Sequence, residues 1–396
     1  MRILFSSIPT QSHIAPMLPL VASAVRAGHD VTFATGAEGI PLVALPGVHA
    51  VELGSTWAAA QAWYAQLTAD TAYQPASPDE ALVHYLVNMY GRYLGPRMAA
   101  AIVPFTATLK PDLVVAETGE FAGPTAALVA GVPFAVHGYG PQPAAAITPL
   151  VTAAIAAIHR SYGLDPSAST SWITAPYLDP WPRVLDDSSS SMFANPLPIR
   201  PAAVAPALPR HEVLDALPFQ KTVYVTLGTM FNDTAAGRAT LDKLIGVFET
   251  ARLNAVVTVG RDGDLGRFAR PADNIRIRDF VPQDAVIPYV DAVLSHGGAG
   301  TSLGALGHGV PHVMTPVASD QYRIAQKVAD ADAGIVLSPD ASVDDIRTAL
   351  HRVLSEESFD VAARAVGETL QAMPDADQAL HQLLLAVGAL SGAERA

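Results

Sequence analysis

Short runs of Val, Ile and Leu alternate with longer Ala- and Leu-rich helical patterns along most of the chain, and this alternation occurs twice. Apolar strands separated by helices are typical of parallel sheets that are covered by helices on both faces. The sequence therefore predicts an α/β protein with two doubly wound, Rossmann-like domains, whose strand ends face one another across a cleft. We expect strands at residues 2–7, 30–35, 49–53, 113–117 and 134–137, then at 222–227, 255–259, 275–277, 292–295, 312–315 and 334–337.

A proline-rich segment separates the two halves. With 396 residues the chain is too long for one ordinary hydrophobic core and suits two domains. Prolines are dense in residues 195–201 and recur through residues 202–218. Because proline continues neither a helix nor a central strand, we expect a stiff linker here, with domains at residues 1–200 and 219–375 and the linker proper at 201–218.

Charge and cysteine content exclude several classes of protein. The net charge of −13 argues against nucleic acid or an anionic membrane as a partner, and the absence of cysteine excludes disulfides and thiolate metal sites. The N-terminal apolar run is broken at Pro9, too early for a signal peptide, and residues 144–158 are shorter than the roughly 20 apolar residues of a membrane span. We expect a soluble, cytoplasmic protein.

A glycine-rich turn follows the apolar run at residues 292–295. It contains His296, Gly297, Gly298 and Gly300 and leads into a helical pattern at Thr301. Glycines let backbone N–H groups approach an anion, and a helix N-terminus adds partial positive charge. Such turns also use glycine for geometry alone. The next strand, however, is followed by Asp320 and Gln321, whose side chains can hydrogen-bond hydroxyl groups. A phosphate-binding turn beside such side chains suggests that the ligand is a sugar nucleotide.

Two other loops of the second half have site-like compositions. Gly228 and Thr229 could donate N–H and hydroxyl groups to phosphate, and a plain Gly-Thr turn is the alternative. Phe280, Val281 and Gln283 offer an aromatic face and backbone groups to a pyrimidine, and a strand-end turn is equally compatible.

An Asp-x-Asp pattern at Asp262 and Asp264 resembles the metal-binding pattern of some sugar transferases. It lies between glycines in a turn, where aspartate is common, and another diphosphate seat is already available. We interpret both residues as turn residues.

His13 follows the first strand and is the candidate general base, because imidazole accepts a proton near neutral pH. A turn histidine is the alternative. Glu117 ends the fourth strand at the same sheet edge and is a candidate to orient His13, whereas we expect Glu120 to be a solvated loop residue.

Aromatic residues are concentrated between residues 57 and 93 of a chain with only 7% aromatics. Packing of helices is the default explanation for most of them, and the lining of an apolar acceptor pocket is the alternative. The candidates for acceptor binding are Trp57, Trp63, Tyr85, Met89, His137 and Tyr139.

Phe-Val-Pro-Gln at 280–283, His-Gly-Gly-Ala-Gly-Thr at 296–301 and Asp-Gln at 320–321 resemble, in order and spacing, the motifs of family 1 glycosyltransferases with the GT-B fold. The chain is similar to actinobacterial enzymes of antibiotic and natural-product biosynthesis, such as the calicheamicin and macrolide glycosyltransferases. One departure is Glu117, where many members have aspartate.

The resemblance implies an N-terminal acceptor domain, a C-terminal donor domain and a final helix, residues 376–396, that packs back on the first domain. It implies one inverting displacement of a deoxysugar from a TDP- or UDP-sugar to an apolar aglycone, with His13 as base and no cofactor or metal, in a monomer or homodimer. A GT-B sugar-nucleotide epimerase and a non-catalytic sugar-nucleotide-binding protein are the alternatives. The implied donor-binding residues are Gly228, Thr229, Phe280, Val281, Gln283, His296, Gly298, Ala299, Gly300, Thr301, Asp320 and Gln321.

Overall fold

The computed structural model describes residues 1–186, 191–228, 235–260, 265–268 and 271–393. These residues form two compact units. Unit 1 comprises residues 1–181, 187–202 and 373–396, and unit 2 comprises residues 182–186 and 203–372. Each unit is built around its own parallel sheet.

Over the described residues, the sheet of unit 1 has seven strands in the order β3-β2-β1-β4-β5-β6-β7, and every pairing is parallel. This is the doubly wound arrangement that the alternating pattern predicts, with the strand order reversing between β1 and β4. The strands are β1 (Arg2–Ser6), β2 (Asp30–Thr35), β3 (Val48–Glu52), β4 (Leu113–Glu117), β5 (Phe134–His137), β6 (Pro176–Asp179) and β7 (Asn195–Pro198).

The last two strands of unit 1 were not expected from the sequence. Residues 195–198 open the proline-rich segment and were not expected to form a strand, yet they form β7, in which Pro196 pairs with Tyr177 and Pro198 with Asp179. β7 is the edge strand of the sheet, so a proline without an N–H group leaves no neighbour unpaired. The prediction failed because proline excludes a central strand but not an edge strand.

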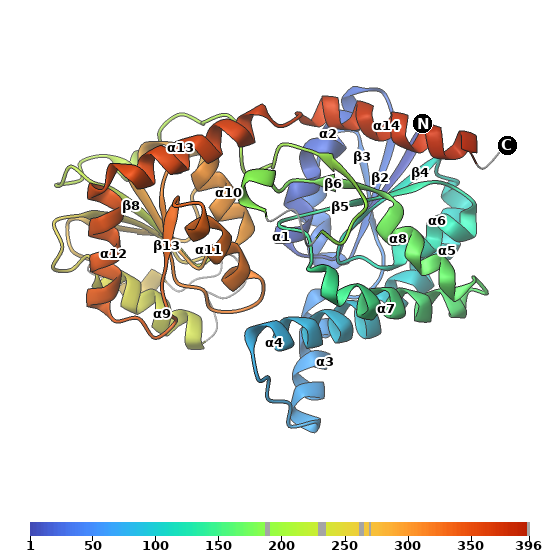
Figure 1. The fold of residues 1–396 in the computed structure, drawn as a ribbon, viewed down its shortest axis with the longest axis horizontal. Helices are drawn as coiled ribbons and strands as arrows, with labels where there is room; N and C mark the ends of the chain where they lie inside the picture. The colour runs from blue at the N-terminus through green and yellow to red at the C-terminus, as the bar shows by residue number, and fades with distance from the viewer. Residues whose placement is uncertain (187–190, 229–234, 261–264, 269–270, 394–396) are drawn as a thin grey trace. The chain divides into compact units, whose positions relative to one another are not determined.

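Helices cover both faces of the first sheet (Figure 1). One is supplied by the end of the chain: α14 packs against α2, and its Leu380, Leu383 and Val387 join the same core as Phe5 and Phe33 of the sheet. The helices of unit 1 are α1 (Gln11–Ile14), α2 (Leu18–Arg26), α3 (Trp57–Asp70), α4 (Pro78–Tyr85), α5 (Gly95–Leu109), α6 (Ala122–Ala130), α7 (Thr148–Ser161), α8 (Ser171–Thr174) and α14 (Ala376–Ala393), with short 3-10 segments η1 (Ala15–Met17), η2 (Ala37–Val43), η4 (Ala145–Ile147) and η5 (Pro166–Thr170).

A π-helix, η3 (Leu86–Leu94), joins α4 to α5. Its hydrogen bonds span five residues, as in the bond from Gly95 N to Tyr90 O at its end. Together α4, η3 and α5 form one run of helix from residue 78 to residue 109.

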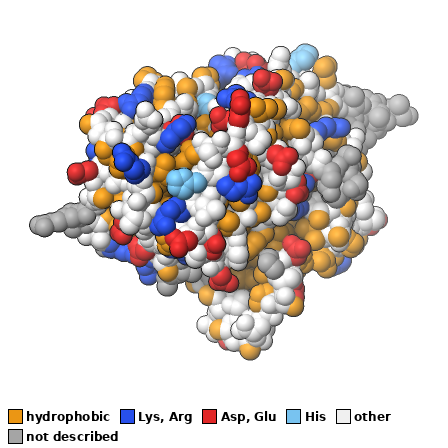
Figure 2. Space-filling model, turned by 60° about the vertical axis from the view of Figure 1, so that its left-hand side comes forward, with side chains coloured by type: hydrophobic (Ala, Val, Ile, Leu, Met, Phe, Trp, Pro, Cys, Tyr) orange, Lys and Arg blue, Asp and Glu red, His pale blue; other side chains and the backbone are white. Residues whose placement is uncertain are grey.

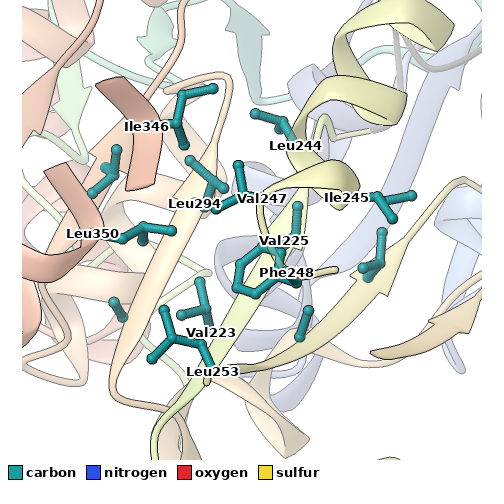
Figure 3. Packing of buried hydrophobic residues seen from close by; sticks show 14 of the residues in the cluster. Val223, Val225, Leu244, Ile245, Val247, Phe248, Leu253, Leu294, Ile346 and Leu350 are labelled. Atoms are coloured by element: carbon teal, nitrogen blue, oxygen red, sulfur yellow. The ribbon is translucent and has the colours of Figure 1, made fainter. Parts of the chain in front are cut away.

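The described part of unit 2 contains a parallel sheet of six strands in the order β10-β9-β8-β11-β12-β13. Figure 3 shows its core, where Leu244 of α9 and Ile346 and Leu350 of α12 lie over Val225 and Leu294 of the sheet. The strands are β8 (Thr222–Thr226), β9 (Asn254–Thr258), β10 (Ile275–Arg278), β11 (Ala292–Ser295), β12 (His312–Met314) and β13 (Gly334–Val336). The helices are α9 (Ala235–Gly246), α10 (Ala299–Gly307), α11 (Gln321–Asp330), α12 (Val343–Ser355) and α13 (Glu357–Ala372), with η6 (Arg183–Leu185), η7 (Glu212–Leu214), η8 (Leu265–Phe268), η9 (Gln283–Ala285) and η10 (Ile287–Tyr289).

The segment expected as a linker is packed on unit 2 from residue 203 onward. Leu208 N donates to Asp284 O at 2.9 Å and His211 N donates to Ala285 O at 3.0 Å, while Leu214 is buried in a core cluster. These contacts give the proline-rich segment fixed partners.

None of the described helices is both long and apolar enough to cross a membrane. On the face drawn in Figure 2, acidic and basic side chains are interspersed among apolar ones.

Candidate functional site

The candidate base and the donor-binding candidates lie at the carboxyl ends of parallel strands, most of them next to the point where the strand order of each sheet reverses. Four acceptor candidates lie instead in the helical segments α3, α4 and η3: Trp57, Trp63, Tyr85 and Met89. In unit 1 the strand ends are those of β1, β4 and β5, and in unit 2 they are those of β8, β10, β11 and β12. Ligands of open α/β sheets bind at these positions.

His13 and Glu117 meet at the edge of the first sheet. His13 lies in the one-turn helix α1, and Glu117 is the last residue of β4, which pairs with β1. His13 Nδ1 is 2.8 Å from Glu117 Oε1, with both side chains buried. The two atoms are within ion-pair distance but are not aligned as a hydrogen bond. Because Nδ1 faces the carboxylate, Nε2 is the atom available to a substrate proton.

The loop after β4 is held by its own carboxylates. Gly119 N donates to Glu117 Oε1 at 2.8 Å. Glu120 accepts hydrogen bonds from Ser6 Oγ at 2.7 Å, Ala122 N at 2.7 Å and Gly123 N at 2.8 Å.

The expectation that Glu120 is a solvated loop residue is wrong. Its side chain is buried, and this burial raises its pKa against the lowering effect of its three hydrogen bonds. The carboxylate caps the first turn of α6, where the helix dipole favours negative charge.

Aromatic rings surround His13. The ring centroid of Tyr139, which is half-buried, lies 4.2 Å from that of His13, and Tyr90 contacts His13 edge-on at 6.0 Å. Tyr90 in turn contacts Tyr85 at 5.9 Å, and Tyr85 contacts Tyr64 at 5.0 Å. A continuous series of rings therefore runs from α3 to the candidate base.

The other acceptor candidates differ in exposure. Trp63 is half-buried and contacts the ring of Tyr93 at 5.1 Å, whereas Trp57, at the start of α3, is buried. We expected Met89 and His137 to line an acceptor pocket, but both are fully buried and present no side-chain surface to a ligand. His137 is the last residue of β5, a strand inside the sheet whose residues are all buried, and burial lowers the pKa of His137 to about 4.

In unit 2, the glycine-rich turn between β11 and α10 has the geometry of an anion seat. Gly297 is left-handed, with φ of 79°, and Gly298 is the N-cap residue of α10. The N–H groups of Ala299, Gly300 and Thr301 belong to the first turn, where a helix offers no acceptor. Gly300 is exposed, and a Cβ atom added to it would meet nothing within 4 Å.

His296 is enclosed by two glycines. A Cβ atom at Gly228 would lie 2.7 Å from His296 Cε1, and one at Gly298 would lie 2.5 Å from His296 Nε2. Burial lowers the pKa of His296 to about 4, so the ring is neutral at pH 7. Its Nδ1 atom is buried and has no hydrogen-bond partner in the described structure.

The structure brings the segment 280–283 to the glycine-rich turn. Gln283 Nε2 donates to Thr301 Oγ1 at 3.3 Å, and the Phe280 side chain is 38% exposed. Val281 is buried in a core cluster, so only its backbone can face a ligand.

The Asp320–Gln321 pair begins α11. Gln321 is buried, and its Oε1 accepts from Val317 N at 2.8 Å and Ala318 N at 3.1 Å, so its amide group shapes the loop. Asp320 is half-buried at the N-cap position. Thr229, Asp262 and Asp264 lie outside the described residues. Among the residues that the structure describes, no three His, Asp or Glu side chains cluster as a metal site.

Sequence reasoning did not single out Ser295 and His312, which lie beneath the glycine-rich turn and are hydrogen-bonded to each other at 2.8 Å. The available signal was a histidine and a serine in strands that are otherwise apolar.

Two protein-family models match the chain. Their descriptions are the N-terminal and C-terminal domains of erythromycin biosynthesis protein CIII-like proteins, and they match residues 23–195 and 249–385.

Similar proteins of known name include the elloramycin glycosyltransferase ElmGT of Streptomyces olivaceus, 29% identical over 94% of each chain. The 3-alpha-mycarosylerythronolide B desosaminyl transferase of Saccharopolyspora erythraea is 25% identical over 94% of this chain and 95% of the relative. Among solved structures, the glycosyltransferase VinC in complex with dTDP has a TM-score of 0.76 at 22% identity, covering 98% of this chain and 100% of VinC. SsfS6 of Streptomyces sp. SF2575, complexed with thymidine diphosphate, has a TM-score of 0.74 at 21% identity, covering 97% and 99%.

Proposed function

The chain belongs to the erythromycin biosynthesis protein CIII-like family of glycosyltransferases. We therefore propose that it transfers a deoxysugar from a TDP- or UDP-sugar to a hydroxyl group of an apolar natural-product aglycone. Unit 1 binds the acceptor and unit 2 binds the donor. The reaction is a single displacement that inverts the anomeric carbon and uses no metal ion.

The contact between His13 and Glu117 carries the acceptor half of the proposal. His13 Nε2 takes the proton of the acceptor hydroxyl as its oxygen bonds to the anomeric carbon. Glu117 Oε1, 2.8 Å from Nδ1, stabilises the imidazolium that forms. The half-buried rings of Tyr139 and Tyr85 supply apolar surface for the aglycone.

The donor half is supported by the first turn of α10. The bond from the anomeric carbon to the diphosphate breaks, and negative charge develops on the leaving nucleoside diphosphate. The N–H groups of Ala299, Gly300 and Thr301 are placed to stabilise this charge. His296, enclosed between Gly228 and Gly298, lies beside this turn. Similar solved structures, VinC and SsfS6, are complexes with the nucleoside diphosphate that such a donor would release.

The test combines binding with product analysis. Thymidine diphosphate should bind in a calorimetric titration, and a TDP-deoxysugar with a hydroxylated aglycone should give a glycoside of inverted configuration. Two alternatives predict other outcomes. An epimerase converts the donor without an acceptor, and a non-catalytic protein binds the donor and leaves both compounds unchanged.

Metal independence is tested in the same assay. EDTA should leave the rate of transfer unchanged, because backbone N–H groups and His296 provide the electrostatic stabilisation. A strict requirement for added magnesium or manganese would contradict this part of the proposal.

A further inference from the structure

A buried polar chain lies beneath the glycine-rich turn and is not used in the mechanism above. Ser295 Oγ accepts a hydrogen bond from Gly297 N at 3.0 Å and lies 2.8 Å from His312 Nε2. Ser295 ends β11, and His312 begins the neighbouring strand β12. Both side chains are completely buried.

The hydrogen-bond inventory favours one arrangement of protons. The serine oxygen already accepts from Gly297 N, and its single hydrogen can be donated to His312 Nε2. The imidazole proton is then on Nδ1, which has no partner in the described structure. If Nε2 carried the proton instead, both the serine O–H group and the Nδ1 lone pair would be unsatisfied. Burial lowers the pKa of His312 to about 3, consistent with a neutral ring.

Through the contact with Gly297, this series of hydrogen bonds reaches the start of the proposed diphosphate-binding turn, residues 296–301. Gly297 has a φ of 79°, a left-handed conformation, and the next residue is the N-cap of α10. The direction of the Gly297 peptide therefore influences where the first free N–H groups of α10 point. Ser295 Oγ is the atom that holds this peptide from below.

We infer that His312 is a positioning residue for the donor diphosphate. By accepting a hydrogen bond from the Ser295 hydroxyl, it directs the oxygen lone pair of Ser295 to Gly297 N and so fixes the turn that presents the α10 N–H groups. His312 acts through Ser295 and Gly297 and does not itself touch the ligand. The inference rests on the proposed donor site.

Calorimetric titration with thymidine diphosphate tests the inference on the full chain. Relative to the wild type, His312→Leu and Ser295→Ala should each weaken binding about tenfold, the effect of losing one well-placed hydrogen bond. His312→Gln should restore binding to within about threefold of the wild type, because the glutamine side-chain oxygen can accept a hydrogen bond from the serine hydroxyl near the position of Nε2.

Asn274 provides a matched control for lost stability. It is a buried residue of unit 2 whose Nδ2 donates to Phe248 O at 2.9 Å and Leu253 O at 2.8 Å, before β10 and away from the turn. Asn274→Ala should lower the thermal unfolding midpoint and leave the affinity for thymidine diphosphate unchanged. His312→Leu should lower the affinity even where its unfolding midpoint matches that of the wild type.

The possible failures are distinguishable. If the wild type binds thymidine diphosphate and His312→Leu binds it equally well, the positioning role is wrong and the proposed function stands. If His312→Gln binds as weakly as His312→Leu, the role of Nε2 as acceptor is wrong. If the wild type itself does not bind thymidine diphosphate, both the donor site and the positioning role are overturned.

Discussion

Gly300 is a residue that the fold itself does not require to be glycine. A Cβ atom added at Gly300 would project into open space, and the φ angle of Gly300 is not in the left-handed region. Replacing a helical glycine with alanine stabilises a helix by up to about 1 kcal/mol. A close approach of backbone to ligand would explain why a glycine is present.

We therefore predict that Gly300→Ala keeps or raises the unfolding midpoint but weakens binding of thymidine diphosphate about tenfold or more. Gly298→Ala is the contrasting variant, because its Cβ atom would lie 2.5 Å from His296 Nε2. This second variant should lose both stability and affinity. Calorimetry and thermal melts of the two proteins check the prediction, and unchanged affinity of Gly300→Ala would place the diphosphate elsewhere.

His13 and Glu117 should act as one unit. We predict that His13→Ala lowers the rate of transfer about a hundredfold or more, the range for a lost general base, while the affinity for thymidine diphosphate is unchanged. Glu117→Gln keeps the shape of the side chain and removes its charge, so it should lower the rate as well. The double variant should be little slower than His13→Ala. The acceptor should carry an alkyl hydroxyl group, since a more acidic hydroxyl group can ionise without a base. With such an acceptor, near-full turnover by His13→Ala would rule out His13 as the general base.

Three buried histidines predict an acid-sensitive fold. Burial lowers the pKa of His137 and His296 to about 4 and that of His312 to about 3, from 6.5 in the unfolded chain. The unfolded state therefore binds protons first as the pH falls. Above pH 6.5 these histidines are neutral in both states and do not change the free energy of unfolding. Below pH 6.5 each of them lowers the free energy of unfolding, by up to about 3 kcal/mol near pH 4. Urea midpoints should be constant above pH 7 and fall from pH 6.5 to pH 4; a flat profile would contradict the burial of neutral rings.

At the scale of elements, the sequence predicts strands better than it predicts the winding of helices. The strands that carry the site end in recognisable turns, such as Glu117 after β4 and the glycines after β11, and they were found to within one or two residues. β7 was missed because prolines mask an edge strand. Nothing in the composition of residues 86–94 distinguishes a π-helix from an α-helix.

The π-helix η3 aligns rings that an α-helix would separate. Because its hydrogen bonds span five residues, residues five apart lie nearly above one another. Tyr85 and Tyr90 are five apart, and their rings are 5.9 Å from each other. In an α-helix residues five apart point in clearly different directions, since only spacings of three and four share a face.

Deleting the exposed residue Arg92 should rewind this segment toward an α-helix. Tyr85 and Tyr90 would remain five residues apart and would no longer face one another, which breaks the series of rings that leads to His13. We predict a higher KM for the acceptor and a lower rate of transfer, with unchanged affinity for thymidine diphosphate. Arg92→Ala, which keeps the chain length, should have kinetics close to those of the wild type. Steady-state kinetics with varied acceptor checks this prediction, and an unchanged acceptor KM in the deletion variant would show that the ring alignment is not used.

At the scale of the whole molecule, the chain passes between the units more than once. Residues 182–186 belong to unit 2 although their neighbours belong to unit 1, and Asp186 pairs with Lys327 at 2.7 Å. α14 returns to unit 1, where Asp377 accepts from Ser23 Oγ and from an Arg26 nitrogen, each at 2.6 Å. An exchange of parts must therefore follow the packing of the units and not the order of the sequence.

The proposed division of labour predicts how chimaeras with a relative behave. Residues 57–93 carry the rings that lead to His13, and residues 280–321 carry the seat around α10. Replacing 57–93 with the corresponding segment of the elloramycin glycosyltransferase should change the preferred aglycone and leave the preferred sugar nucleotide unchanged. Replacing 280–321 should change the preferred sugar nucleotide alone. In both chimaeras α14 must remain the native helix, because its Leu380 and Leu383 complete the core of unit 1. Competition assays with paired donors and paired acceptors measure both preferences, and a donor preference that follows residues 57–93 would show that the two units do not divide the substrates in this way.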